Sequence, residues 1–248
     1  MDIARVIALL SHEDAEVRGR AVLELPILTH GEPPTTEMVA AAIALTTDPV
    51  KRVRDAACFV LGEQFREVDT PELRDALADR LDDVDRETRC EALVGLAYRR
   101  DPRALPQVRR ALTRRSGDVW QLELVAAGAL GDPLLHPLVA AHRTGWDDDV
   151  ASGQADAAYR LTDPEGPGDD LLDGVAELSR RRGHGRPDGD SIGAWRSMSV
   201  LLDIAPFRAR EFYDAVASRL EGDEAALHDL REGSALAQLA DEARESGV

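Results

Sequence analysis

The feature that most constrains this chain is an Asp-Pro pair that recurs at a fixed interval. Asp101-Pro102, Asp132-Pro133 and Asp163-Pro164 lie 31 residues apart, twice in succession, and each pair follows an apolar stretch with helical spacing. A period of about 20–50 residues is the sequence signature of a solenoid, in which one short unit stacks on copies of itself. The recurrence therefore predicts a stack of similar units, each burying its apolar face on its neighbours.

Each repeated unit carries signals for two helices. In the first helix, Arg is followed by Ala three residues later and by Leu four residues after that, which places the apolar side chains on one face. These positions are Arg18, Ala21 and Leu25; Arg54, Ala57 and Leu61; and Arg89, Ala92 and Leu96. The second helix begins near a Pro, because the missing N–H of Pro costs nothing in the first turn. These positions are Pro71, Pro106 and Pro137, with Leu73, Val108 and Val139 two residues further on.

Three segments carry a resemblance to a known family of helical repeats. They are DPVKRVRDAACFVLG, YRRDPRALPQVRRAL and LGDPLLHPLVAAHR. Residues 12–164, which contain them, resemble HEAT repeats of the short bacterial type, also described as HEAT-like repeats of the phycobilisome lyase class. The resemblance implies an all-α fold, a right-handed α-solenoid of HEAT-like helical hairpins. No stretch alternates apolar and polar residues with a period of two, so we also expect no sheet.

The pattern changes after Pro164, and we expect two parts: a HEAT-like repeat array over residues 1–164, and divergent repeats with a C-terminal helical cap over residues 165–248. Gly/Pro-rich segments, DPEGPGDD and RRRGHGRPDGD, flank one amphipathic helix in the second part. A separate small helical domain from about residue 188 is the alternative. The arginines around His184 in the second loop could form an anion site, with a solvated linker as the alternative.

Charge and cysteine content narrow the classes of partner. The net charge of -17, from 47 acidic and 30 basic residues, disfavours nucleic acid and anionic membranes, which need a positive field. The single Lys among 30 basic residues indicates the coding bias of a GC-rich bacterium. The two cysteines, Cys58 and Cys90, give no disulfide framework and are expected to be small buried apolar residues. Because the first residues lack a basic leader, we expect a cytoplasmic location and no membrane anchor.

Arg18, Arg54 and Arg89 recur at one position of the repeat, and we expect them to have a structural role. Asp14 and Asp85 lie four residues before Arg18 and Arg89, so each pair shares a helix face. The resemblance to HEAT-like families implies a ladder of Asp–Arg pairs that runs between units. A recurring residue is explained more simply by a recurring packing need than by a unique function.

The second helices are the candidate ligand surface, because the resemblance implies that they line the concave face of the solenoid. We expect them over residues 71–81, 104–115 and 134–143, each with polar side chains opposite its buried anchors. The candidate partner-binding residues are Asp75 and Asp79 on the first; Gln107, Arg110 and Arg114 on the second; and His136 and Arg143 on the third. Mutual screening of neighbouring charges is the alternative interpretation, with each surface pair contributing about 0–1 kcal/mol.

A basic belt covers residues 84–116, which contain nine Arg and four acidic residues in an otherwise acidic chain. Such a belt could receive an acidic peptide, a phosphate or a nucleic acid. Tyr98 is its one aromatic residue, so bases would have no run of stacking partners, and we consider nucleic acid unlikely. A protein or peptide is therefore the partner that we expect.

No catalytic or metal-binding constellation stands out. Trp120, Trp146 and Trp195 could be compared with the aromatic site of HEAT-like alkylpurine DNA glycosylases, but they occupy non-equivalent repeat positions. His136 and His142 lie six residues apart, unlike a metal-binding pair one helical turn apart. We expect a non-catalytic scaffold without a cofactor. The alternative is an enzyme or enzyme accessory that acts on an anionic substrate, similar to an alkylpurine DNA glycosylase or a chromophore lyase.

Overall fold

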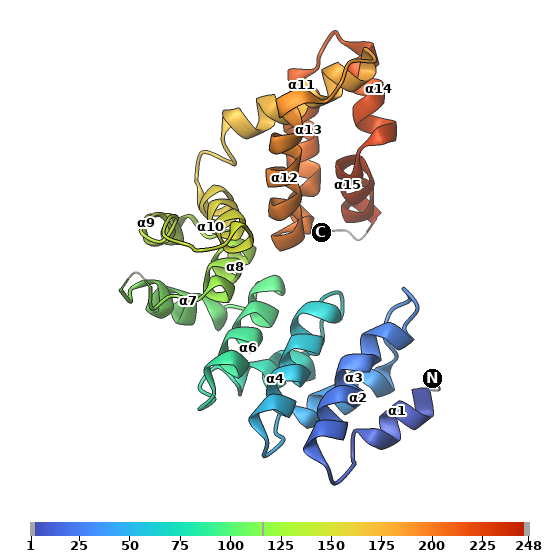
Figure 1. Ribbon diagram of the computed structural model, residues 1–248, viewed down its shortest axis with the longest axis vertical. Helices are drawn as coiled ribbons and strands as arrows, with labels where there is room; N and C mark the ends of the chain where they lie inside the picture. Colours follow the sequence, from blue (N-terminus) through green and yellow to red (C-terminus); the bar gives the residue numbers. More distant parts are fainter. Residues whose placement is uncertain (1–2, 116, 246–248) are drawn as a thin grey trace. The chain divides into compact units, whose positions relative to one another are not determined.

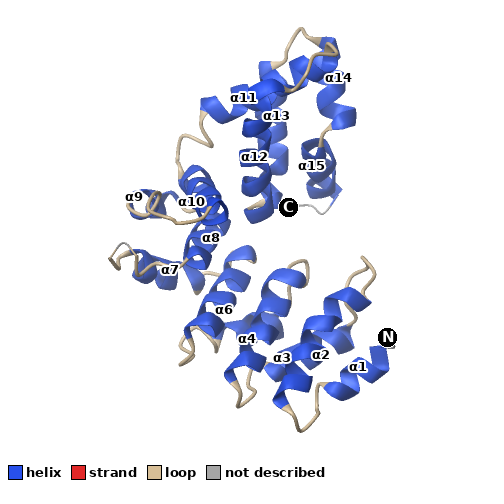
Figure 2. Ribbon diagram, viewed as in Figure 1, coloured by secondary structure: helices blue, strands red, loops and turns tan. Residues whose placement is uncertain are grey.

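The structure is a computed structural model that describes residues 3–115 and 117–245, and its chain is traced in Figure 1. The chain forms two compact units, Met1–Leu130 and Gly131–Val248. Every regular element within the described residues is a helix, as Figure 2 shows. None of these helices combines the length and the apolar character that a membrane span requires.

The first unit, Met1–Leu130, is a series of helical hairpins. Its helices are α1 (Ile3–Leu9), α2 (Ala15–Leu28), α3 (Thr36–Leu45), α4 (Lys51–Phe59), α5 (Pro71–Ala78), α6 (Arg86–Tyr98), α7 (Ala104–Leu112) and α8 (Gln121–Leu130), with a π-helical segment Val60–Gln64 that continues α4. The hairpins are α2–α3, α4–α5 and α6–α7. Their first helices pack in sequence, α2 on α4, α4 on α6 and α6 on α8. The predicted all-α, solenoid-like stack of hairpins is thereby confirmed.

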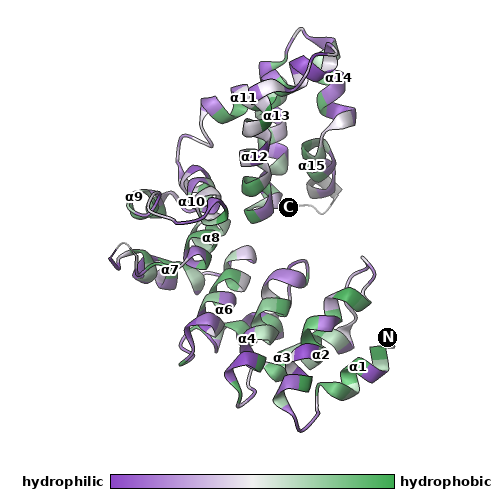
Figure 3. Cartoon of the chain, in the orientation of Figure 1, coloured by the Kyte–Doolittle hydropathy of each residue, from purple (hydrophilic) through white to green (hydrophobic). Residues whose placement is uncertain are grey.

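The predicted repeat register is correct at its apolar anchors. The Ala and Leu of all three first helices are at most 1% exposed; they are Ala21, Leu25, Ala57, Leu61, Ala92 and Leu96. Full burial of one Leu side chain stabilises a fold by about 1.5–3 kcal/mol. In Figure 3, α2, α4 and α6 each carry both hydrophobic and hydrophilic residues. An Ala and a Leu thus occupy equivalent buried positions in each of the three hairpins.

Capping residues fix where the helices begin. The side chains of Asp14, Thr35, Thr70 and Asp85 accept hydrogen bonds from main-chain N–H groups in the first turns of α2, α3, α5 and α6. An N-cap of this kind stabilises a helix by about 1 kcal/mol. The expected start of α7 at Ala104 is correct, whereas its end was placed too late, because α7 ends at Leu112 rather than at residue 115. The expected helix over residues 134–143 is short as well, with α9 covering His136–Ala140.

The contact between α4 and α6 is unusually close. An added Cβ on Gly95 would lie 2.6 Å from the Cα of Gly62 in the π-helical segment after α4, so Gly95 has no room for a side chain. Near this contact, the buried guanidinium of Arg99 donates to the carbonyls of Leu61, Gly62 and Phe65 at 2.8–3.3 Å. These carbonyls lie at the end of the π-helical segment, where the chain leaves orphan acceptors. Arg99 therefore completes a helix that belongs to the preceding hairpin.

The second unit, Gly131–Val248, contains α9 to α15. After α9 come α10 (Asp149–Thr162), α11 (Asp169–Gly183), α12 (Ile192–Ile204), α13 (Ala209–Arg219), α14 (Glu224–Gly233) and α15 (Ala235–Glu245). Within the unit, α10 packs on α12, α11 on α12 and α14, and α13 on α15. The first compact unit ends at Leu130, inside the expected array 1–164. The predicted change from regular to divergent repeats at 164/165 concerns the sequence pattern, and it stays a prediction.

Candidate partner-binding site

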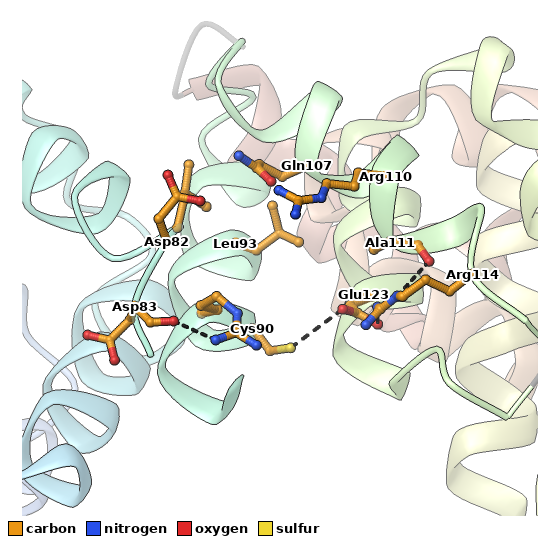
Figure 4. A pocket seen from close by; sticks show the side chains of 11 residues that line it. Asp82, Asp83, Cys90, Leu93, Gln107, Arg110, Ala111, Arg114 and Glu123 are labelled. Carbon is orange, nitrogen blue, oxygen red and sulfur yellow. Dashed lines mark hydrogen bonds and ion pairs between the residues drawn. The ribbon is translucent and has the colours of Figure 1, made fainter. Parts of the chain in front are cut away.

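A pocket of about 380 Å³ lies in the first unit beside the α6–α7 hairpin, and we call it the α6–α7 pocket. It is partly open to solvent, and residues from four segments line it, as Figure 4 shows. They are Leu81, Asp82 and Asp83 from the loop after α5; Arg89, Cys90 and Leu93 from α6; Gln107, Arg110, Ala111 and Arg114 from α7 and its end; and Glu123 from α8. Polar and apolar side chains are mixed, which suits a segment of a peptide better than a purely apolar small molecule.

Three of the seven residues predicted from the sequence lie in this pocket. Gln107 and Arg110 project from α7 toward Leu93 of α6 in Figure 4, and Arg110 is exposed. Arg114 differs from the expected outer-face position, because it is half-buried and pairs with Glu123. Gln107 and Arg110 are therefore available to a ligand, whereas Arg114 also holds α7 against α8.

Glu123 is a buried carboxylate that the sequence pattern did not single out. Its side chain is 6% exposed and forms ion pairs with Arg114 and, at 3.5 Å, with Arg86. Its second role is to accept the main-chain N–H of Trp120 at 2.7 Å. The guanidinium of Arg86 lies 4.2 Å from the centre of the Trp120 ring. The three-residue spacing from Trp120 to Glu123 is that of a capping box, and this signal could have revealed it.

Cys90 forms part of the pocket wall and is 2% exposed. Its Sγ lies 3.9 Å from Oε1 of Glu123. Burial, and then the negative charge of Glu123, raise the pKa of the Cys90 thiol to about 12. The thiolate is the reactive form of cysteine, so this thiol is a poor nucleophile at neutral pH. Cys58 is fully buried too, which confirms the expectation that both cysteines are buried apolar residues.

The expected Asp–Arg ladder is present for two of the three arginines. Arg18 donates from Nε and Nη2 to the carboxylate of Asp48, at 2.7 and 3.0 Å. Arg54 binds Asp83 in the same two-pronged way, at 2.8 and 2.7 Å. The Arg54 guanidinium holds the pKa of the Asp83 carboxyl below its usual range. Each pair joins a first helix to the loop before the next first helix, so the ladder ties successive hairpins together.

The third arginine, Arg89, is arranged differently. Its Nη1 donates to the carbonyl of Asp83, six residues earlier, as Arg18 and Arg54 donate to carbonyls six residues before them. Asp118 is the corresponding partner by sequence, 35 residues after Asp83, but Asp118 is exposed. Within the described residues no carboxylate pairs with Arg89. Its guanidinium lines the α6–α7 pocket instead.

The first hairpins are similar to a known family of repeats. Residues 3–94 match the model for HEAT repeats. The match ends within α6, so the segment that is similar to HEAT repeats covers the two complete ladder pairs and part of the pocket wall.

Curated relatives and solved structures are also similar to this chain. YibA of Escherichia coli K12 and YibA of E. coli O157:H7 are each 34% identical to this chain over 106 residues, which is 43% of this chain. The matched region spans 36% of YibA, about a third of its length. The crystal structure of YibA has a TM-score of 0.42 and 24% identity, covering 63% of this chain and 67% of that one. An engineered protein has a TM-score of 0.46 and 15% identity, covering 100% and 98%.

The two acidic residues predicted on α5 lie outside the pocket. Asp75 is exposed and accepts a 2.7 Å bond from Nη1 of Arg103, at the entrance to α7. Asp79 is exposed just beyond the end of α5. Their exposure agrees with the expected outer face of this second helix. Their role in binding a partner stays a prediction.

His136 and Arg143, which were predicted on the expected helix over residues 134–143, belong to the other compact unit. Nδ1 of His136 lies 3.2 Å from the carbonyl oxygen of Tyr159, which can only accept a hydrogen bond, and the His136 ring lies 4.4 Å from the Tyr159 ring. Arg143 bonds Asp156 at 2.7 Å and lies over the same Tyr159 ring. Both side chains thus hold α9 and the loop after it against α10. A role in partner binding at these residues is a separate prediction from the α6–α7 pocket.

The segment RRRGHGRPDGD is less of a loop than its glycines indicated. The helix α11 continues through Gly183, so Arg180, Arg181 and Arg182 are helical. Arg182 pairs with Asp188 at 2.7 Å, and His184 lies 3.0 Å from a carboxylate oxygen of Asp223. Arg182 and His184 thus already face acidic partners, which disfavours an anion site at these two residues.

The structural features expected of the alternative enzyme do not gather at the α6–α7 pocket. None of the eleven residues that line it is a Trp, and Trp120 is covered by Arg86. Trp146 donates from its indole to the carbonyl of His142 at 2.8 Å, within the second unit. Among the described residues, no cluster of His, Cys, Asp or Glu is arranged to hold a metal ion.

Proposed function

We propose that this chain is a non-catalytic scaffold that binds a protein or peptide through the second-helix face of its first unit. The contact would centre on the α6–α7 pocket. The observation that carries the proposal is the placement of Gln107 and Arg110, which project into an open pocket within the basic belt. Exposed arginines and amides of this kind are common in interfaces, since they combine contact area with hydrogen bonding.

The chemistry of the pocket wall favours binding over catalysis. Asp83 is committed to Arg54, and Glu123 is committed to Arg86 and Arg114. The thiol of Cys90 is buried and protonated at neutral pH because its pKa is raised to about 12. A general base needs a pKa near the working pH and an unengaged lone pair. Among the lining carboxylates, only the exposed Asp82 has no ion-pair partner in the described chain, and the buried thiol is a poor nucleophile, so the lining favours binding over catalysis.

Site-specific photocrosslinking tests the proposal. We would replace Gln107 with p-benzoylphenylalanine in the full chain and irradiate it in lysate of the native source. Arg109 is the matched control position, because it is exposed on the same helix but does not line the pocket. We expect one dominant protein adduct from position 107, absent from position 109, and lost when Arg110→Glu is added.

The melting temperature of the Arg110→Glu variant provides the check on folding. Arg110 is exposed and, among the described residues, forms no ion pair, so reversal of its charge should change stability by less than about 0.5 kcal/mol. Arg114 is left unchanged, because a Glu at that position would face the buried Glu123. Identical adducts from positions 107 and 109, or adducts that survive Arg110→Glu, would refute binding at this pocket.

A further inference from the structure

The Asp–Arg ladder shows what each of its arginines binds. In Arg18 and Arg54, Nη1 donates a hydrogen bond to a carbonyl six residues earlier. Nε and Nη2 of the same guanidinium donate to the carboxylate of an aspartate. A planar guanidinium and a carboxylate match in this two-pronged geometry, which is among the strongest charged hydrogen bonds. The same side chain at the same repeat position thus has a built preference for a carboxylate.

Arg89 keeps the orienting bond and lacks the aspartate. Its Nη1 donates to the carbonyl of Asp83, so the guanidinium is anchored by the same bond as in the other two arginines. Its Nε and Nη2 have no partner within the described residues, and the side chain is half-buried in the pocket wall. A partly desolvated guanidinium with two unused donors favours an anion in front of it.

The hydrogen bonds of the loop before α8 explain why Asp118 does not pair with Arg89. In the two complete junctions, Asp48 and Asp83 also accept the N–H of the residue two positions later, at 2.8 and 2.9 Å. At the third junction, Glu123 accepts the corresponding N–H of Trp120. The carbonyl of Asp118 instead accepts a bond from Arg86. Glu123 has replaced Asp118 as the acceptor in the loop, and it is saturated by other arginines.

The remaining charges of the pocket also favour an anion. Asp83 is neutralised by Arg54 and Arg80, and Glu123 by Arg86 and Arg114. Arg89 and Arg110 are then two cations without an acidic partner in the described chain. The exposed Asp82 is an acidic residue of the same lining and offsets one of these two charges. Leu93 and Cys90 supply an apolar wall beside them. The local excess is therefore positive, although the whole chain is acidic.

We propose that Arg89 and Arg110 bind the side-chain carboxylate of an aspartate in a peptide segment of the partner. The partner's aspartate would take the position relative to Arg89 that Asp48 takes to Arg18 and Asp83 takes to Arg54. This inference rests on the proposed scaffold function and deepens it, because it names the chemistry that the pocket recognises. The chain's own loop, Thr-Thr-Asp-Pro-Val-Lys at residues 46–51, is the pattern for such a ligand.

The test is a titration of the full-length protein with a blocked hexapeptide of sequence TTDPVK, followed by the NMR signals of the arginine Nε–H groups. A second peptide, TTNPVK, and inorganic phosphate are the comparison probes. We expect saturable binding of the Asp peptide with a shift of the Arg89 Nε–H signal, and at least tenfold weaker binding of the Asn peptide. A tenfold change corresponds to about 1.4 kcal/mol.

Three variants decide whether the named residues are responsible. Arg89→Gln and Arg110→Gln should each weaken the Asp peptide at least fivefold, whereas Arg109→Gln on the same helix should leave its affinity unchanged. Circular dichroism establishes that each variant is folded, and Arg110→Gln remains informative if Arg89→Gln unfolds. Equal affinity for the Asp and Asn peptides, or no loss in Arg89→Gln and Arg110→Gln, would overturn the proposal.

The other outcomes separate this inference from the scaffold function. If phosphate binds at Arg89 and the Asp peptide does not, the carboxylate assignment is wrong. If the peptide binds as expected but position 107 yields no crosslinked protein, the anion site stands and the scaffold function fails. If position 107 crosslinks a protein and Arg89→Gln leaves that adduct unchanged, the scaffold stands and the carboxylate inference fails.

Discussion

The junction between α4 and α6 and the junction between α6 and α8 are built from the same repeat, yet one is closed and the other is open. At the closed junction, Gly62 meets Gly95 and the pair Arg54–Asp83 joins the hairpins. At the open junction, Arg89 has no aspartate within the described chain, and a pocket of about 380 Å³ remains. The difference shows that one loop, in which Glu123 replaces Asp118 as the acceptor, suffices to leave a structural arginine without its internal partner.

The largest expected effect comes from replacing the arginine at the equivalent repeat position of each junction, which is Arg54 at the closed junction and Arg89 at the open one. Arg54→Gln leaves the buried Asp83 without its two-pronged partner, and breaking a buried pair costs about 3–5 kcal/mol. Arg89→Gln removes one hydrogen bond to a carbonyl and should cost about 1 kcal/mol or less. Urea unfolding of the two variants measures both values. Equal losses in the free energy of unfolding would mean that Arg89 contributes as much to stability as Arg54 does.

A smaller effect is expected from filling the close contact of the closed junction. Gly95→Ala places a Cβ 2.6 Å from the Cα of Gly62 and 2.8 Å from Leu77, so the helices must separate. Overpacking of this kind costs about 1–3 kcal/mol. Gly19→Ala is the control, because its Cβ would lie 3.9 Å from the nearest atom, and a helical Ala is favoured over Gly. Thermal melts should show a lower midpoint for Gly95→Ala only; similar midpoints for the two variants would contradict the tight crossing.

The smallest expected effect depends on pH and on a carboxyl at the closed junction. Burial, and then the neighbouring Glu63, raise the pKa of Glu91. The folded state therefore keeps a proton that the unfolded state releases above the ordinary pKa of glutamate, about 4.3. The stability that this proton provides is full below that pH and is lost as pH rises through the raised pKa.

Glu91→Gln removes this pH dependence, since an amide resembles the protonated acid. We expect the variant to be more stable than the wild type at pH 8 and equal to it near pH 4. The exposed Glu87, one turn earlier on α6, supplies the control Glu87→Gln, which should not differ from the wild type. The measurement is the melting temperature from pH 4 to pH 9. A stability gain that is the same at every pH would show that the carboxyl is not protonated in the fold.

The sequence predicted the parts of the fold that every repeat contains. The buried positions of Ala57 and Leu61 followed from helical periodicity, and the pairing of Arg54 with an aspartate followed from its recurrence together with the family resemblance. Gln107 and Arg110 were predicted because their helix face lies opposite the buried anchor Val108. Recurrence is informative in this chain because neighbouring units face the same packing problem.

What the sequence did not predict depends on contacts between distant residues. Arg99 resembles a surface arginine until the π-helical segment, which ends 35 residues earlier, presents carbonyls to it. Glu123 resembles an exposed acid on an amphipathic helix until Arg86 and Arg114 approach it. Because Arg114 was placed on the outer face without this partner, its structural contribution was missed. Periodicity assigns a helix face, whereas ion pairing depends on which side chains the neighbouring hairpin brings within reach.

The bonds from Arg99 have a consequence for how the stack comes apart. A chain of units that touch only their neighbours can unravel from its ends, one hairpin at a time. Arg99 follows α6 directly, but the acceptors that it satisfies belong to the end of the helix before α5. Opening either hairpin leaves buried polar groups of the other hairpin without hydrogen-bond partners. The α4–α5 and α6–α7 hairpins should therefore exchange their amide hydrogens as one cooperative block, at which fraying from the amino-terminal end stops.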